Sequence, residues 1–147
     1  MYLHITIIKN EDYLEEFIIY HRMLGVEHFY IYDNESSFPV SERLNHYYYH
    51  KCCSFIHFPG SVKQMDAYNH CIQHYGKETD WLLIVDGDEF VLPKKHNNLI
   101  DFINEFNDKQ FVSFLKENDS NALKYFNNLS LVPNISVYIV TPKLNNC

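Results

Sequence analysis

The sequence has 147 residues and a mass of 17.6 kDa, which suits one domain with a sizeable hydrophobic core. Hydrophobic residues make up 46% and charged residues 21%, close to globular averages, which excludes disordered and collagen-like chains. The net charge of −7 argues against a nucleic-acid partner, which requires a basic surface. An acidic protein that binds a phosphorylated ligand usually needs a divalent cation to neutralise the phosphate charge.

The cysteines and the N-terminal residues indicate where in the cell the protein is expected to lie. Cys52 and Cys53 are adjacent, which does not fit the Cys-x2-Cys spacing of structural zinc sites, so we expect no such site. Residues 1–9 are too short and too often interrupted by polar side chains to form the core of a signal peptide. No apolar run reaches transmembrane length. We therefore expect a soluble, cytoplasmic protein without a membrane span.

The first third of the chain predicts a strand, a helix and a second strand. Residues 3–8 cluster β-branched side chains, as strands do. Tyr13–Leu24 has apolar residues near helical spacing and is followed by Gly25, where a helix C-cap belongs. The aromatic and β-branched run 28–32 predicts another strand, which ends at the polar turn 33–37.

The same alternation continues further along the chain. Residues 53–58 predict a third strand, and residues 62–75 predict a helix that ends at Gly76. The five consecutive apolar residues 81–85 predict a strand covered on both faces, as in a parallel sheet. Weaker signals for one helix and two strands follow at residues 97–106, 111–115 and 137–140. Alternating strands and helices predict an α/β fold, with a mostly parallel sheet flanked by helices.

Polar clusters follow three of the predicted strands, at residues 9–11, 33–34 and 86–89. Ligands of open α/β sheets bind beyond the carboxyl ends of the strands. We therefore expect these three turns to converge on one site.

Asp86 and Asp88 alternate directly after the apolar strand 81–85. Carboxylates in this arrangement can hold Mg²⁺ or Mn²⁺, while phosphate oxygens take further positions of the metal. A cation between these carboxylates and a diphosphate would offset the repulsion between the acidic protein and the phosphates. It would also stabilise a leaving diphosphate. Glu89 can then orient a metal-bound water or act as an outer partner. An acidic pair alone is more often a solvated turn, but its place after a buried strand favours the metal.

A series of short motifs follows one order over residues 3–93. These motifs are Lys9-Asn10-Glu11, Leu14-Glu15-Glu16-Phe17, Tyr20-His21, Leu24-Gly25-Val26, His28-Phe29-Tyr30-Ile31-Tyr32-Asp33-Asn34, Ser36-Ser37, Gln64, Ala67-Tyr68-Asn69-His70-Cys71, Trp81-Leu82-Leu83-Ile84-Val85-Asp86-Gly87-Asp88-Glu89-Phe90 and Pro93. In this order they resemble the N-terminal, donor-binding half of family 92 and related family 2-like glycosyltransferases. Such a series is far more specific than the Asp-x-Asp pair alone.

The resemblance implies a GT-A fold, a Rossmann-like sheet that binds a nucleoside-diphosphate sugar, and a metal-dependent, hexosyltransferase-like activity toward a glycan or protein acceptor. It implies that Asp86 and Asp88 hold Mn²⁺ or Mg²⁺ and that Asp33 contacts the base or ribose. Gln64 and Asn69 would reach toward the sugar or diphosphate. The implied nucleotide-sugar site comprises Lys9, Asn10, Glu11, Asp33, Gln64, Asn69 and Asp86.

The resemblance ends near residue 93. We expect a single domain over residues 1–147, with a nucleotide-sugar-binding core at 1–93 and a divergent or truncated part at 94–147. No motif identifies a catalytic base. Carboxylates that could serve are Asp101, Glu105, Asp108, Glu117 and Asp119, but nothing in the sequence places any of them opposite the metal.

Other interpretations remain open. The chain can be a non-catalytic nucleotide-sugar-binding module or an inactive fragment of such an enzyme. A phosphatase of the haloacid-dehalogenase type also has two alternating aspartates after an apolar strand, but it needs a Ser or Thr shortly afterwards, where this chain has Glu89-Phe90-Val91. Asp33 can simply cap a turn. His70 and His74 are one helical turn apart and could bind a metal, although no acidic or cysteine partner stands at metal-motif spacing.

Overall fold

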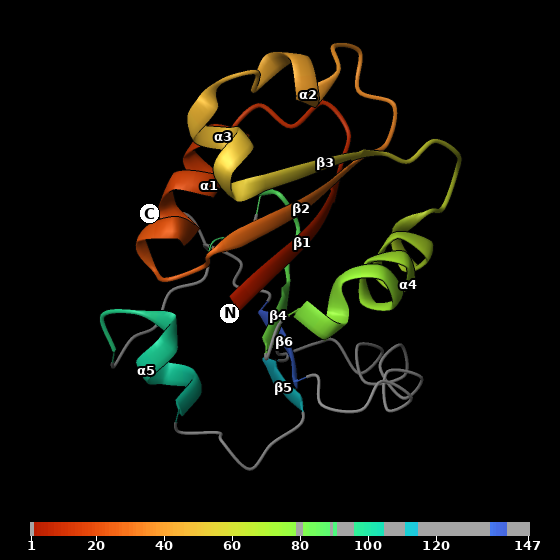
Figure 1. The fold of residues 1–147 in the computed structure, drawn as a ribbon. Helices are drawn as coiled ribbons and strands as arrows, with labels where there is room; N and C mark the ends of the chain where they lie inside the picture. The colour runs from red at the N-terminus through yellow and green to blue at the C-terminus, as the bar shows by residue number, and fades with distance from the viewer. Residues whose placement is uncertain are drawn as a thin grey trace.

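The computed structural model describes residues 2–78, 81–88, 90, 96–104, 111–114 and 136–140 (Figure 1). Its strands form one six-stranded sheet in the order β3-β2-β1-β4-β6-β5, and every neighbouring pair is parallel. The strands are β1 (Tyr2–Ile8), β2 (His28–Asp33), β3 (Cys53–His57), β4 (Trp81–Ile84), β5 (Phe111–Phe114) and β6 (Ser136–Val140). The helices are α1 (Leu14–Met23), α2 (Val40–Arg43), α3 (Tyr47–Cys52), α4 (Gln64–Tyr75), the 3-10 helix η1 (Gly76–Glu78) and α5 (Leu99–Asn104).

The direction in which the chain crosses the sheet first reverses beside β1, and it reverses again where β6 forms between β4 and β5. The chain moves outward from β1 to β2 and β3, and then returns to the other side of β1 to form β4. The paired register runs from Leu3↔His28 to Ile8↔Asp33 on one side. On the other side it ends at Ile5↔Ile84. The carboxyl ends of β1 and β4 therefore flank a topological switch point, the usual place for a ligand in this class of fold.

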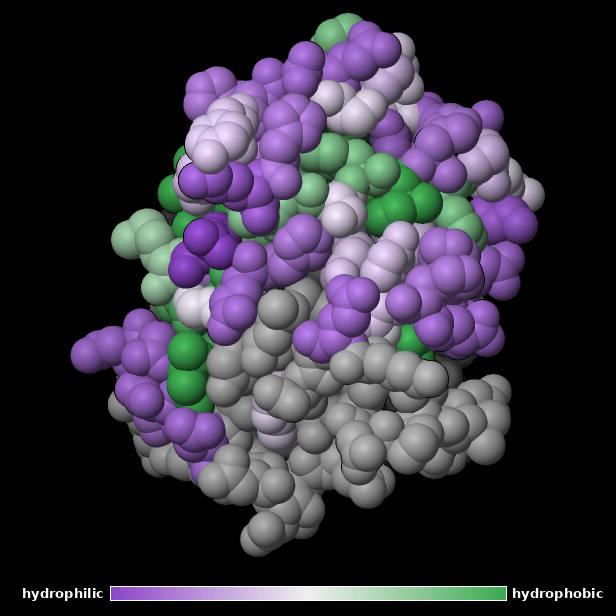
Figure 2. Space-filling view, in the orientation of Figure 1, coloured by the Kyte–Doolittle hydropathy of each residue, from purple (hydrophilic) through white to green (hydrophobic). Residues whose placement is uncertain are grey.

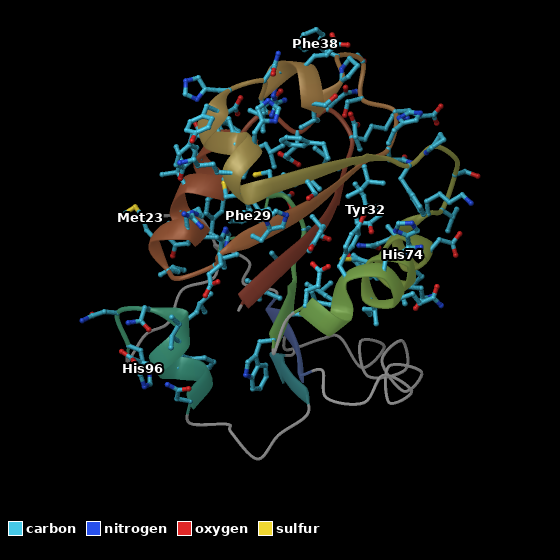
Figure 3. All side chains as sticks on the ribbon, in the orientation of Figure 1. Met23, Phe29, Tyr32, Phe38, His74 and His96 are labelled. Carbon is cyan, nitrogen blue, oxygen red and sulfur yellow. The ribbon has the colours of Figure 1, made fainter. Side chains whose placement is uncertain are left out.

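Side chains alternate between two separate hydrophobic clusters, one on each face of the sheet. Phe29 and Ile31 of β2 pack with residues of α1, α2 and α3, whereas Tyr30 and Tyr32 pack against α4. Figure 3 shows Phe29 and Tyr32 on opposite sides of the ribbon. Right-handed crossovers require this arrangement, because a change of winding direction moves the connecting helix to the other face.

The edge strand β3 is less well covered than the centre of the sheet. Phe55 and Ile56 are partly exposed, and Figure 2 shows hydrophobic side chains over β3 surrounded by hydrophilic residues. No helix in the described part of the chain is long and apolar enough to cross a membrane, since the longest, α4, has 12 residues.

The predicted α/β class and parallel sheet are confirmed, and so are the weaker strands at 111–115 and 137–140, which correspond to β5 and β6. The helix predicted over 62–75 begins two residues later, because the backbone of Val62 is left-handed with φ +54°. Helices α2 and α3 were not predicted, because they are too short to show helical periodicity.

A buried histidine anchors the segment that follows the Asp-x-Asp turn. His21 is fully buried in α1, and its Nδ1 donates to the Phe17 carbonyl at 2.8 Å. The ring of Phe90 stacks on His21 at 5.8 Å and meets Phe17 and Tyr20 edge-on. Burial lowers the pKa of His21 to about 4, although the bond to Phe17 opposes this shift. The histidine is therefore neutral in the folded protein near neutral pH.

We predict that His21 makes the protein less stable as the pH falls from about 6.5 to about 4. Over this range the unfolded chain binds a proton at His21 that the folded chain excludes, which costs on the order of 3 kcal/mol by pH 4. Urea unfolding at several pH values should show that His21→Leu loses this part of the pH dependence. The exposed control His74→Gln should keep it. An unchanged slope in His21→Leu would contradict the assignment.

Candidate functional site

The loops after β1 and β2 are joined by hydrogen bonds at the carboxyl edge of the sheet. The backbone N–H of Asn10 donates to Ser36 Oγ at 3.0 Å, and the N–H of Ser37 donates to Asn10 Oδ1 at 2.7 Å. The N–H of Asn34 also donates to the carbonyl of Ile8 at 2.8 Å. These bonds fix the two loops relative to each other.

Asp33 holds the loop after β2. The residue is 7% exposed, and its Oδ1 and Oδ2 accept the backbone N–H groups of Ser36 and Val40, each at 3.0 Å. Burial by itself raises the pKa of Asp33, but the hydrogen bonds from Ser36 and Val40 outweigh it, so the pKa lies below its ordinary value. The carboxylate is thus ionised and already serves as a turn cap, and its predicted contact with a base or ribose stays a prediction.

Asn34 and Glu35 bring the loop after β3 to the same edge. Asn34 Nδ2 donates to the carbonyls of Phe58 and Gly60, both at 2.8 Å. Glu35 Oε2 accepts the Gly60 N–H at 3.3 Å. The loops after three neighbouring strands therefore form one hydrogen-bonded unit.

Backbone strain is concentrated in these same loops. Among the described residues, the non-glycine positions with positive φ are Asn10 (+53°), Glu35 (+58°) and Val62 (+54°). They follow β1, β2 and β3 respectively. A β-branched residue is a genuine outlier in this region, and Val62 is also 97% exposed. Strain of this kind persists only where the surroundings enforce it, and it clusters at functional sites.

Asp86 is oriented from the first residue of α4. Gln64 Nε2 donates to Asp86 Oδ1 at 3.1 Å and to the Tyr68 hydroxyl at 2.8 Å. Tyr68 is buried between α4 and the sheet, so it fixes the position of the amide. The turn after β4 is therefore linked to the start of α4.

Asp88 lies within electrostatic range of the loop after β1. The pKa of Glu11 is raised by partial burial and then by the negative charges of Asp88 and Asp12, against the opposing effect of Arg43. Arg43 of α2 also donates to the Glu11 carbonyl at 2.7 Å and pairs with Glu15 at 3.4 Å. Three carboxylates, from Glu11, Asp86 and Asp88, thus gather beside the switch point.

The structure gathers most of the predicted site residues at this edge. Those tied to it by the contacts above are Asn10, Glu11, Asp33, Gln64, Asp86 and Asp88. Lys9 is exposed at the end of β1. Asn69 is exposed on α4, and no hydrogen bond of its side chain is found within the described ranges. Glu89 lies outside the described residues.

Sequence reasoning missed the roles of Asn34, Ser36 and Arg43. The first two stood in the quoted motifs, but their partners could not be read from the chain. Arg43 lies in α2, a helix that the sequence pattern did not predict.

Asp101 is the one predicted candidate for a catalytic base that the structure describes. It lies in α5, where its N–H bonds Asn98 Oδ1 at 2.8 Å and its carboxylate accepts from Asn98 at 3.0 Å. Leu99 bonds the carbonyl of Leu24, just after α1 and before β2 begins. Asp101 is therefore near the amino edge, away from Asp86 (Figure 1). The other candidates, Glu105, Asp108, Glu117 and Asp119, lie outside the described residues.

The fold and this edge define an open α/β protein with its polar loops gathered at the carboxyl ends of a parallel sheet. The sequence model of glycosyltransferase family 92 matches residues 6–134, and the chain belongs to this family. The resemblance seen in the motifs is thereby confirmed. The expectation that it ends near residue 93 is wrong, because the family match continues to residue 134.

Similar proteins include plant members of the family. A rice (Oryza sativa subsp. japonica) family 92 protein is 27% identical over 114 residues, which are 76% of this chain and 19% of that protein. Family 92 proteins of Arabidopsis thaliana and Ricinus communis are each 31% identical, over 63% and 62% of this chain and 16% of each relative. The chain thus spans less than a fifth of the length of these relatives. No solved structure gives a significant match.

We predict that Asp33→Asn destabilises the fold by about 2 kcal/mol, the usual worth of a hydrogen bond to a charged group. The amide keeps one acceptor oxygen but turns its N–H₂ toward the N–H of Ser36 or Val40. Urea unfolding at neutral pH measures the change. Asp66→Asn is the control, because Asp66 is exposed and pairs with Lys63 at the surface. Equal effects of the two substitutions would contradict the capping role.

Proposed function

We propose that this chain binds a nucleoside-diphosphate sugar at the carboxyl edge of the sheet and supplies the donor site of a GT-A-type glycosyltransferase. The enzyme would transfer the sugar to a glycan or protein acceptor. The observation that carries the proposal is the convergence of four loops at the β1/β4 switch point, where Gln64 orients Asp86. Membership of glycosyltransferase family 92 supports the same chemistry.

The acidic residues at this edge suit a divalent metal. Within the described residues, no group of three or more His, Cys, Asp or Glu side chains is arranged to enclose an ion. A pair of carboxylates fits Mg²⁺ or Mn²⁺ well, because these ions are commonly bound by one or two carboxylates together with substrate phosphates. The hydrogen bond from Gln64 does not exhaust Asp86, since each carboxylate oxygen has two lone pairs. When bound, the metal would offset the charge of a leaving diphosphate.

We propose the following roles for the loops around this pair. Lys9 can offer its ammonium group to the diphosphate, and Asn10 and Glu11 line the nucleotide. Asp33 retains lone pairs that can accept from a ribose hydroxyl or a base N–H. Burial and the negative charges of Asp88 and Asp12 raise the pKa of Glu11, and a cation beside a bound phosphate would offset the repulsion from these carboxylates. The overall charge of −7 has the same consequence.

A second candidate function is nucleotide-sugar binding without transfer by this chain. The position of Asp101 favours it, because the one described candidate for a catalytic base lies at the opposite edge of the sheet. Both functions predict metal-dependent binding of the donor. Only the first predicts a glycosylated product.

We predict that UDP-sugars or GDP-sugars bind the full chain with Mn²⁺ and much more weakly without it. Titration calorimetry should show that Asp86→Asn weakens this binding by about tenfold or more, since it removes a charged ligand. Asp66→Asn, on the exposed face of α4, should leave it unchanged. Binding that ignores both Mn²⁺ and Asp86 would refute the donor site. A product assay with candidate acceptors then separates transfer from binding alone.

We predict that Gln64→Ala weakens Mn²⁺-dependent binding of the free nucleoside diphosphate as much as that of the nucleotide sugar, by about tenfold. The reason is that Gln64 holds Asp86, which would contact the metal. If Gln64 instead contacts the sugar, only binding of the nucleotide sugar should weaken. Gln73→Ala, an exposed amide on the same helix, is the matched control.

A further inference from the structure

We propose that Arg43 of α2 is a positioning residue of the donor site, which holds the loop after β1 in the conformation that receives the nucleotide. The inference rests on the proposed function, which assigns residues 9–11 of this loop to the nucleotide. Arg43 contacts no ligand in this proposal. It acts on the loop through the backbone of Glu11 and through the carboxylate of Glu15.

The guanidinium group of Arg43 bridges the connection between β1 and α1. Its Nη1 donates to the Glu11 carbonyl oxygen at 2.7 Å, and its Nη2 donates to Glu15 Oε2 at 3.5 Å. Its Nε lies 3.4 Å from Glu15 Oε1. Glu11 belongs to the loop, whereas Glu15 lies in the first turn of α1. Because the donors of a guanidinium lie in one rigid plane, these contacts fix the loop relative to the helix.

The segment that carries Arg43 also holds the other half of this loop. The N–H of Asn10 donates to Ser36 Oγ at 3.0 Å, and Asn10 Oδ1 accepts the N–H of Ser37 at 2.7 Å. Figure 1 shows the loop running beside α2. Asn10 has a left-handed backbone with φ +53°, and such a conformation persists only where the surroundings enforce it. The loop is thus held at two places by one segment of the chain.

The bond to Glu11 matters more for the loop than for the stability of the fold. The side chains of Arg43 and Glu15 are 25% and 36% exposed, and an ion pair with this much exposure adds little to folding stability. The bond to the Glu11 carbonyl has a charged donor, and such bonds are short and strong. We therefore expect loss of Arg43 to loosen the loop without unfolding the protein.

The charge of Arg43 separates a positioning role from an effect on the metal. Its positive charge lowers the pKa of Glu11, against the larger effects of burial, Asp88 and Asp12. Removing a positive charge from this acidic edge cannot weaken the attraction of a cation. A positioning role therefore predicts weaker binding of the nucleotide with undiminished binding of Mn²⁺.

A second arginine with the same kind of bond serves as the control. Arg22 Nη1 donates to the Glu27 carbonyl oxygen at 2.8 Å. Arg22 lies in the last turn of α1, and Glu27 directly precedes β2. This bond is therefore at the amino edge of the sheet, opposite the loop after β1.

The first measurement is backbone ¹⁵N relaxation of the full chain without ligand, which reports on the loop alone. Residues 10–12 of the unchanged chain should have order parameters of about 0.85, and in Arg43→Ala these should fall toward about 0.6. Arg22→Ala should leave them unchanged. A rigid loop in Arg43→Ala would overturn the proposal, whether or not the chain binds a nucleotide.

The second measurement is titration calorimetry with UDP and GDP in the presence of Mn²⁺. We expect Arg43→Ala to bind the nucleotide about tenfold more weakly than the unchanged chain. Arg43→Lys should lose about threefold, because one ammonium group keeps the charge but not the planar fork, and it replaces Arg43→Ala if that variant unfolds. Binding of Mn²⁺ alone, followed by electron paramagnetic resonance, should not weaken in either variant.

The two proposals fail in different ways. If the unchanged chain binds no nucleotide, the proposed function fails and the role of Arg43 fails with it. If the unchanged chain binds and the Arg43 variants bind equally well, only the role of Arg43 is overturned. Equal loss in Arg22→Ala would overturn it as well.

Discussion

The parallel pairing of β1 with both β2 and β4 is the constraint on which the rest of the structure depends. Because all three strands run in one direction, Ile8, Asp33 and the turn after Ile84 leave the sheet at the same edge. Segments that are distant in the sequence thereby become neighbours. Reversing any one of these strands would carry its polar turn to the opposite edge, where α5 begins.

Side-chain hydrogen bonds then convert this neighbourhood into a fixed arrangement. Asn10 and Asn34 act as bridges, because each amide satisfies backbone groups of another loop. Hydrogen bonds of this network engage both Asn10 and Glu35, whose backbones are left-handed. The cost is a concentration of negative charge, since Glu11, Asp86 and Asp88 share the edge. A neutral or anionic ligand would gain little from such an arrangement by itself, whereas a cation would gain most.

The sequence predicted the sheet well because its strands are apolar or β-branched runs that end in polar turns. It also predicted Asp86 as a site residue, because its position after a buried strand can be read from the sequence alone. It could not predict that Gln64 would bond Asp86, because that contact joins residues 22 positions apart and depends on where α4 begins. Arg43 was missed for a similar reason, since α2 is a single turn set by tertiary packing of Val40 and Leu44.

Helix α4 connects the edge of the sheet to the hydrophobic core. Its first residue, Gln64, donates to Asp86 at the edge of the sheet and to the hydroxyl of Tyr68. Tyr68 lies on the inner face of the helix, where it packs with Tyr32 of β2 in one hydrophobic cluster. Because the same tyrosine packs in the core and accepts from Gln64, packing of α4 against β2 sets the position of the amide that holds Asp86.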